Sequence, residues 1–326
     1  MRKKLGILLS FAMLGMMVFT GCGGGKATAS GKEVKILLAL NEMDTFRQTL
    51  IEAAQKTAEE EGVQLDVKDA EGSIENQVNF LKSAEEDGYN VILCSAVSAE
   101  TVVELKASAG DIPIIFINSC PEEKQLREGE YIYAGSRESE AGQYQAEYIL
   151  DRMADKDEIN VVLLKGPKGH SATEGRTNGA KQTLEASGKK INYVFEDYAN
   201  WEQDQAKSMF EIFLKTGAKA DCVICNNDSM ALGVIDACKE AGIDLSELPV
   251  LGVDATADGC AAIQKGDMAF TVYQSALGQG EAAVKAAIKF AKGESLDALE
   301  GVTEDGKYVW VPFERVDKSN VSDYSN

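Results

Sequence analysis

Eight polar or aromatic side chains follow short apolar runs of the sequence, and together they suit a hydroxyl-rich ring. Carboxylate, carboxamide and guanidinium groups are planar, and they pair well with hydroxyls, which both donate and accept. Aromatic rings can cover the apolar C–H faces of the same ligand. The residues are Asp44, Phe46, His170, Arg176, Trp201, Asn227, Asp254 and Gln274. We expect these side chains to bind a monosaccharide.

Each of these residues also has a purely structural interpretation. Asp44 can be the N-cap of a helix that begins near Phe46, and Phe46 can be a core aromatic. Arg176 can pair with a nearby acid, and His170 can be an ordinary loop residue. Trp201 lies in a polar stretch, where a core role explains it less well. Their joint placement at the ends of apolar runs favours a binding site.

Two adjacent residues compete for one helix cap. Asn227 and Asp228 both precede a helical pattern at 229–241, and both residue types are good N-caps. We assign the cap to Asp228 and keep Asn227 for the ligand.

Catalytic signatures are missing from the sequence. It contains no G-x-G-x-x-G at a strand-to-helix turn, no G-x-x-x-x-G-K-[ST] and no G-x-S-x-G, and His170 is its only histidine. The pair Cys222 and Cys225 has C-x-x-C spacing but lies in an apolar run, and zinc would need further ligands. We therefore expect these cysteines to be reduced core residues. We also expect the protein to bind no metal and no cofactor and not to be an enzyme.

Short apolar runs alternate with amphipathic stretches along the chain. Unbroken apolar runs are typical of parallel strands buried on both faces. The predicted strands are 34–40, 63–67, 90–94, 112–117, 159–164, 192–195, 222–225 and 250–253, and the predicted helices include 46–61, 75–87, 138–153, 203–215 and 229–241. Glycines 62, 88, 188, 217 and 242 stand where helices should end in the left-handed conformation. The alternation predicts a doubly wound α/β architecture.

The strand count exceeds one comfortable sheet, so we expect two doubly wound parallel-sheet lobes joined by a hinge. The predicted first lobe is 34–118 plus 273–296, and the second is 119–272 plus 297–326. The chain should cross between them near Asn118, near Tyr273 and at 293–299. Open α/β sheets bind ligands at the carboxyl ends of their strands, so the cleft between the lobes is the predicted site.

The N-terminus has the pattern of an export signal. Arg2, Lys3 and Lys4 precede an apolar run at 5–19, and small residues precede Cys22. The alternative, a retained transmembrane anchor, needs about 20 apolar residues. We expect residues 1–21 to be a signal peptide and 22–33 a tether. Removal of the signal peptide takes the net charge of the chain from −20 to −23. Such an acidic protein is an unfavourable partner for nucleic acid.

Several motifs in order resemble the galactose/glucose-binding branch of the periplasmic type I sugar-binding proteins. They are Asp44-Thr45-Phe46, the stretch from Leu163 through Gly169-His170 to Arg176-Thr177, Asn200-Trp201, Asn226-Asn227-Asp228, Gly252-Val253-Asp254 and the ending Val309-Trp310-Val311-Pro312. The segment around Cys22 resembles the lipobox of bacterial lipoproteins, in which the cysteine is lipidated. The resemblance covers essentially the whole mature chain.

The resemblance implies a role for each site residue. Phe46 and Trp201 would sandwich the sugar ring, the polar residues would bind hydroxyls, and Gln274 keeps a polar amide at its position. Ala172 and either Cys94 or Ser95 stand where the family has further binding residues, and 155–158 is too short for the family's calcium loop. These departures leave the sugar open, with galactose and glucose ahead of pentoses and inositol.

The resemblance also implies partners and a location. A monomer held at the outer face of the cell membrane by lipid on Cys22 would deliver its sugar to the permease of an ABC importer. The alternative is a sensing module that presents the sugar to a chemoreceptor or a histidine kinase. A sugar-responsive transcriptional regulator of the same fold would need a helix-turn-helix where this chain has an export signal.

Overall fold

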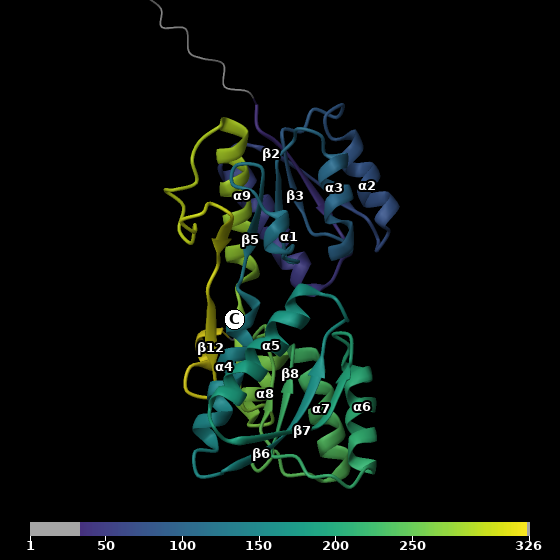
Figure 1. Ribbon diagram of the computed structural model, residues 1–326, viewed down its shortest axis with the longest axis vertical. Helices are drawn as coiled ribbons and strands as arrows, with labels where there is room; N and C mark the ends of the chain where they lie inside the picture. The colour runs from purple at the N-terminus through teal and green to yellow at the C-terminus, as the bar shows by residue number, and fades with distance from the viewer. Residues whose placement is uncertain (1–32, 325–326) are drawn as a thin grey trace, which may run out of the picture. The chain divides into compact units, whose positions relative to one another are not determined.

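The computed structural model describes residues 33–324 and shows two α/β lobes, each built on a parallel sheet (Figure 1). The predicted fold class is therefore confirmed. The predicted signal peptide, Cys22 and nearly all of the tether lie outside the described residues. Within 33–324, no helix has both the length and the apolar character needed to cross a membrane.

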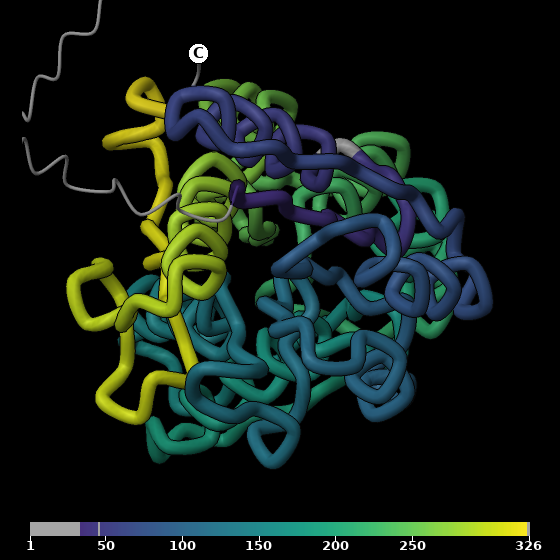
Figure 2. The backbone as a smooth tube through the Cα atoms, turned by 90° about the horizontal axis from the view of Figure 1, so that it is seen from above, coloured from purple at the N-terminus to yellow at the C-terminus, as the bar shows by residue number. Residues whose placement is uncertain are grey.

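The first lobe contains a six-stranded sheet in the order β11-β5-β4-β3-β1-β2, with every pair parallel. Helices α1 and α9 pack on one face of the sheet, and α2 and α3 pack on the other (Figures 1 and 2). The elements are β1 (Lys35–Leu40), α1 (Thr45–Glu60), β2 (Gln64–Asp69), α2 (Ile74–Ser83), β3 (Val91–Cys94), α3 (Val102–Ser108), β4 (Ile114–Ile117), β5 (Tyr131–Gly135), α9 (Ala276–Lys292) and β11 (Tyr308–Trp310).

The second lobe contains a four-stranded parallel sheet in the order β7-β6-β8-β9. Helices α4 and α5 cover one face, and α6, α7 and α8 cover the other. Strand β10 continues beside β9 through parallel bridges and pairs antiparallel with β12. The elements are α4 (Glu138–Arg152), β6 (Glu158–Lys165), α5 (Ser171–Ala186), β7 (Lys190–Tyr198), α6 (Gln203–Lys215), β8 (Cys222–Cys225), α7 (Asp228–Ala241), β9 (Val250–Leu251), α8 (Ala257–Lys265), β10 (Thr271–Gln274) and β12 (Phe313–Val316).

Four of the five predicted helix ends are confirmed at their glycines, whereas α2 ends at Ser83, five residues before Gly88. Gly62, Gly88, Gly188, Gly217 and Gly242 all have φ between 68° and 82°. Only glycine adopts this left-handed conformation without strain from a Cβ atom. The chain can therefore leave each helix sharply and enter the next strand within a few residues.

Two of the three predicted lobe crossings differ from the structure. β5 pairs with β4, and β11 pairs with β5, so residues 131–135 and 308–310 belong to the first sheet rather than to the second lobe. The crossings follow Gly135, Gln274 and Trp310, and only the one near Tyr273 matches its prediction. The strands β5 and β11, of five and three residues, were not among the strands predicted from the sequence.

Helices α4 and α5 approach each other closely through glycines. A Cβ atom on Gly142 would collide with the backbone oxygen of Arg176, and one on Gly179 would collide with that of Ser139. Since no side chain separates the helices here, α4 is held directly against the part of α5 that carries Arg176.

We predict that Gly142→Ala destabilises the protein although alanine is the better helix former. Overpacking typically costs about 1–3 kcal/mol, which exceeds the gain of roughly 1 kcal/mol in helix propensity. Urea unfolding monitored by circular dichroism measures the change. Gln143→Ala, at the exposed neighbouring position, is the control and should have little effect. An unchanged midpoint for Gly142→Ala would contradict the close packing.

Candidate functional site

The buried guanidinium of Arg176 is the centre of the site. Its side chain is 5% exposed, and it lies on α5, the helix that follows β6. Nε donates to Glu138 Oε2 at 2.8 Å, Nη1 to the backbone oxygen of Asn226 at 2.7 Å and Nη2 to Gln274 Oε1 at 3.0 Å. Asp254 Oδ1 lies 3.6 Å from Nη1. The carboxyl ends of β6, β8 and β10 thus converge on one cation.

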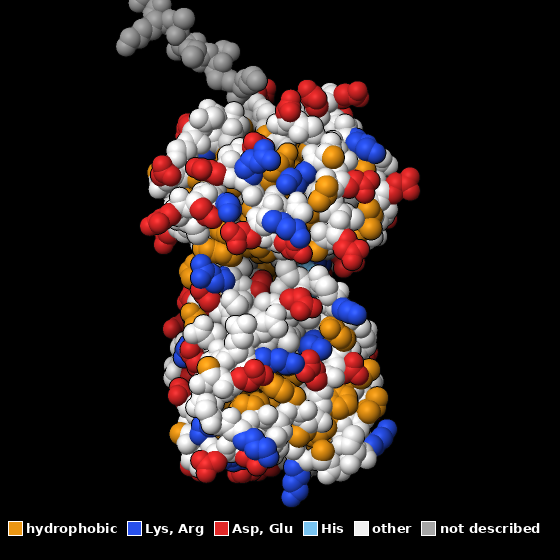
Figure 3. All heavy atoms as spheres, in the orientation of Figure 1, with side chains coloured by type: hydrophobic (Ala, Val, Ile, Leu, Met, Phe, Trp, Pro, Cys, Tyr) orange, Lys and Arg blue, Asp and Glu red, His pale blue; other side chains and the backbone are white. Residues whose placement is uncertain are grey.

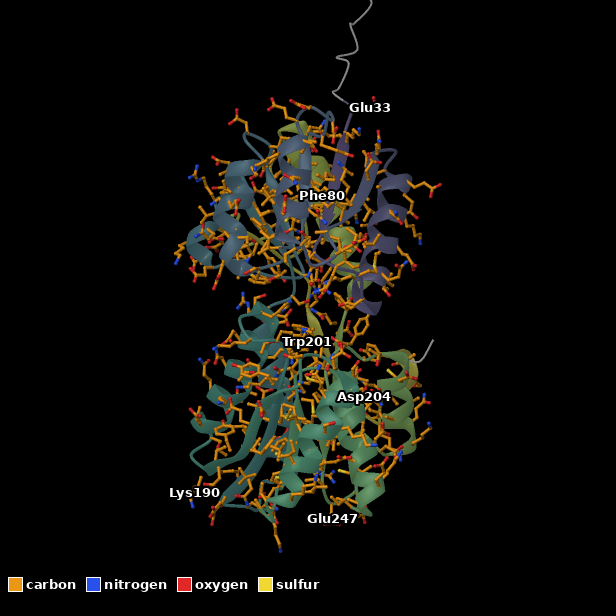
Figure 4. The ribbon with its side chains drawn as sticks, turned by 90° about the vertical axis from the view of Figure 1, so that its right-hand side faces the viewer. Glu33, Phe80, Lys190, Trp201, Asp204 and Glu247 are labelled. Atoms are coloured by element: carbon orange, nitrogen blue, oxygen red, sulfur yellow. The ribbon has the colours of Figure 1, made fainter. Side chains whose placement is uncertain are left out.

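Trp201 lies beside this cation. Its ring centroid is 5.6 Å from Arg176 Cζ and 5.6 Å from the imidazole of His170, which meets it edge-on at 86°. A Cβ atom on Gly166 would collide with the indole, so the absence of a side chain there makes room for the ring. Figure 4 shows Trp201 at the end of the second lobe nearest the first, far from Lys190 and Glu247.

His170 caps α5 and stays uncharged. Its Nδ1 accepts from the backbone N–H of Ala172 at 3.2 Å, so the proton of the neutral ring is on Nε2. Burial, together with the positive charges of Arg47 and Arg176, lowers the pKa of His170 to about 4. The buried Nε2 has no hydrogen-bond partner among the described residues.

Two more buried polar atoms near Trp201 have no partner within residues 33–324. They are Thr173 Oγ1 and Asn226 Nδ2. Thr173 Oγ1 lies against Gly166, as the indole does, and Asn226 Oδ1 accepts from the Gly166 N–H at 3.2 Å. Buried polar groups in native proteins nearly always have partners. With His170 Nε2, these atoms supply hydrogen-bonding capacity beside an aromatic ring.

Asp254 and Gln274 complete the second lobe's part of the site. Asp254 has a φ of 114°, a strained conformation for a residue other than glycine. Burial raises the pKa of its carboxyl well above the usual value, although the charge of Arg176 opposes this. Gln274 is buried, and its Nε2 donates to Glu138 Oε1 at 3.2 Å.

The first lobe contributes Asp44 and Phe46. Asp44 is the N-cap of α1, because its Oδ1 accepts from the Arg47 N–H at 2.7 Å. Phe46 is half-buried and packs partly against the core of its own lobe. No ring contact joins Phe46 to Trp201 within 33–324, so the sandwich of a sugar ring between them stays a prediction.

The assignment of the α7 cap was wrong. Asn227 is the N-cap: its Oδ1 accepts from the Met230 N–H at 3.0 Å, and its Nδ2 donates to the backbone oxygen of Trp201 at 3.3 Å. Asp228 is the first helical residue and is fully buried. Its carboxylate instead accepts from Thr271 Oγ1 at 2.6 Å and from the Thr256 N–H at 2.8 Å, and burial raises its pKa to about 6.

Sequence reasoning missed Glu138, Thr173, Asn226 and Arg47. Glu138 follows the short strand β5, which was itself not predicted, so nothing marked it as a strand-end residue. Asn226 immediately precedes Asn227, and the end of β8 could have indicated it. The prediction of core cysteines is confirmed for Cys222 and Cys225, which are buried residues of β8 without a disulfide, whereas Cys120 is only partly buried.

This geometry defines a two-lobed ligand-binding protein rather than an enzyme, and comparison with known proteins agrees. A family model for the periplasmic binding protein domain matches residues 36–295. The chain is 33% identical over 279 residues to the D-galactose/methyl-galactoside binding periplasmic protein MglB of Haemophilus influenzae, a match covering 81% of this chain and 82% of that protein. The chain belongs to the periplasmic binding protein family, and it acts outside the cytoplasm.

Two further relatives show the breadth of this similarity. A xylitol-binding protein of Mycolicibacterium smegmatis is 28% identical over 300 residues, which cover 90% of this chain and 82% of that protein. An ABC transporter solute-binding protein from Bacillus halodurans, solved with bound myo-inositol, matches with a TM-score of 0.80 at 27% identity. That match covers 91% of this chain and 99% of the solved chain.

We predict that the sole imidazole titrates with a pKa of about 4 in the folded protein, because burial disfavours its charged form. Proton NMR can follow His170 without assignment, since no other histidine is present. The control is the urea-unfolded chain, with a pKa near 6.5. Because the folded pKa is the lower one, stability from this group is lost as the pH falls from about 6.5 to 4. A folded-state midpoint near 6.5 would contradict the burial.

Proposed function

We propose that the protein is the substrate-binding component of an ABC-type importer and binds a monosaccharide or related cyclic polyol between its lobes. The relatives that bind galactosides, xylitol and myo-inositol support a polyhydroxylated ligand. Delivery of the ligand to a membrane permease is part of this proposal, and so is the preference for galactose or glucose.

One observation carries the proposal: a buried guanidinium with oriented acceptors lies beside an aromatic face. Arg176, Asp254 and Gln274 offer donors and acceptors in fixed orientations, and Trp201 offers an apolar plate next to them. Charge-assisted hydrogen bonds contribute about 1.5–3 kcal/mol each. Such a site disfavours ligands that lack the matching hydroxyl, because its own polar groups stay unpaired.

Closure of the lobes would complete the site. The N–H of Cys120, in the loop after β4 of the first lobe, donates to Oγ of Ser171 at the start of α5 in the second lobe, at 2.9 Å. This contact joins the lobes directly beside His170. A ligand that touches both lobes stabilises the closed form by its extra affinity for that form.

The positions that depart from the galactose/glucose pattern are buried. Ala172 is 4% exposed, Cys94 is fully buried in the first lobe's core, and the Ser95 hydroxyl donates to Asn41 Oδ1 at 3.0 Å. None of them offers a free polar group in place of the family's ligand-binding side chains. These departures leave the sugar open: galactose and glucose stay first for screening on the strength of the sequence resemblance, and ribose and myo-inositol are screened beside them.

We predict that one of these four compounds raises the melting temperature of the soluble domain and that Trp201→Ala weakens its binding. Loss of apolar burial of this size costs about 1.5–3 kcal/mol, or roughly 10- to 100-fold in Kd. Titration calorimetry measures the affinity. Trp310→Phe replaces the other tryptophan, which stacks on Tyr308 in the first lobe, and should bind normally. Unchanged affinity in Trp201→Ala would refute this site.

We also propose that lipid on Cys22 anchors the protein to the membrane, as the export signal and lipobox resemblance suggest. Two acyl chains attach a protein stably, whereas one barely does. Cys22→Ser in the full chain should move the protein from the membrane fraction to the soluble fraction on immunoblots. Cys120→Ser removes a cysteine of the folded body and should leave the protein on the membrane. Retention of Cys22→Ser there would contradict the anchor.

A further inference from the structure

Asp44, the predicted hydroxyl-binding residue of the first lobe, is already engaged within the protein. Its Oδ1 accepts from the backbone N–H of Arg47, and its Oδ2 accepts from Arg47 Nη1 at 2.6 Å. Both carboxylate oxygens therefore have a strong donor from the same residue. Asp44 keeps lone pairs, but the group it orients most directly is the guanidinium of Arg47.

Arg47 is held as a buried donor. The residue is 6% exposed, and its Nε donates to Asn118 Oδ1 at 3.1 Å. Asn118 has a φ of 59°, a left-handed conformation at the end of β4 that only a few residue types tolerate. Nε and Nη1 thus have partners, while the contacts within 33–324 give Nη2 no acceptor. A buried guanidinium held from one side has its remaining donors available on the other side.

The guanidinium of Arg47 is bound to the part of the first lobe that contacts the second lobe. Asn118, which binds Arg47, is two residues from Cys120, whose N–H donates to Ser171 Oγ at 2.9 Å. Ser171 directly follows His170. The charge of Arg47 acts on His170 together with that of Arg176, which agrees with this placement.

We propose that Arg47 is a ligand-binding residue of the first lobe, so that Arg47 and Arg176 donate to ligand oxygens from opposite lobes beside His170. The inference rests on the proposed function and adds a contact to it. Guanidinium groups donate and never accept, so the part of the ligand facing Arg47 must be an acceptor such as a hydroxyl oxygen. Two like charges that approach on closure also repel each other, and an acceptor oxygen between them offsets that repulsion.

The alternative is that Arg47 only supports the cap of α1. In that case its loss would lower stability and leave affinity unchanged. A ligand contact predicts the reverse pattern, since Asp44 Oδ1 still accepts from the backbone N–H at position 47 in any variant.

The test uses Arg47→Met, which keeps most of the apolar stem and removes every donor. The probes are D-galactose, D-glucose, D-ribose and myo-inositol, and the tightest binder of the wild type is used for titration calorimetry. We expect Kd to rise about 10- to 100-fold, the usual effect of losing a charge-assisted hydrogen bond. Arg127→Met, at an exposed arginine of the same lobe, should bind as the wild type does.

The outcomes separate this inference from the proposed function. If the wild type binds none of the four probes, the proposed ligand class fails and this inference fails with it. If the wild type binds one and Arg47→Met binds it equally well, only the role of Arg47 is refuted. If Arg47→Met melts well below the wild type, the titration is made at a temperature at which both proteins are folded, and wild-type affinity of Arg47→Met there would overturn the inference.

Discussion

The structure depends on the compensation of one buried positive charge. An unpaired guanidinium in a protein interior is strongly unfavourable, and it is tolerated only with acceptors of good geometry. Arg176 has them: the Glu138 carboxylate, the Gln274 amide oxygen and the Asn226 carbonyl all accept from it. Because these acceptors come from α4, β10 and the end of β8, compensating the charge also fixes three elements relative to α5.

Two of these acceptors lie at the lobe crossings. Glu138 begins α4 shortly after the chain leaves β5, and Gln274 ends β10 just before α9 begins in the first lobe. Glu138 also accepts from Gln274, so the two crossing segments are hydrogen-bonded to each other and to Arg176. Ser136, in the first crossing, accepts from Gln279 of α9 at 3.0 Å. A ligand that binds Arg176 therefore acts on the group that orients these two of the three crossings. Figure 3 shows many other charged side chains spread over the visible face of both lobes. Those side chains lie at the surface, whereas Arg176 is buried.

The sequence predicted the architecture well because most strands are unbroken apolar runs and most helices end at a left-handed glycine. It did not predict β5 and β11, although β5 has five residues and is longer than the predicted strands β3, β4 and β8. Glu138 was missed together with β5. The cap of α7 could not be decided locally, since Asn227 and Asp228 are both good caps. What decides it is the burial of the Asp228 carboxylate against Thr256 and Thr271, which are distant in sequence. Arg176 and Gln274 were found as site residues, but their mutual hydrogen bond required the fold.

Capping a helix and binding a ligand turn out not to be alternatives in this protein. Asp44, His170 and Asn227 are all N-caps, at the ends of helices that follow strands of the sheets. A cap bond fixes one side-chain atom to the helix, and the rest of the side chain is then oriented without cost at the moment of binding. In His170 the cap uses Nδ1, which leaves Nε2 as a donor on the other side of the ring. In Asp44 both carboxylate oxygens accept hydrogen bonds from Arg47, one from its backbone N–H and one from Nη1. Asp44 therefore orients the guanidinium of Arg47. N-cap hydrogen bonds therefore orient a neutral donor, His170 Nε2, in the second lobe and a charged donor, the Arg47 guanidinium, in the first lobe.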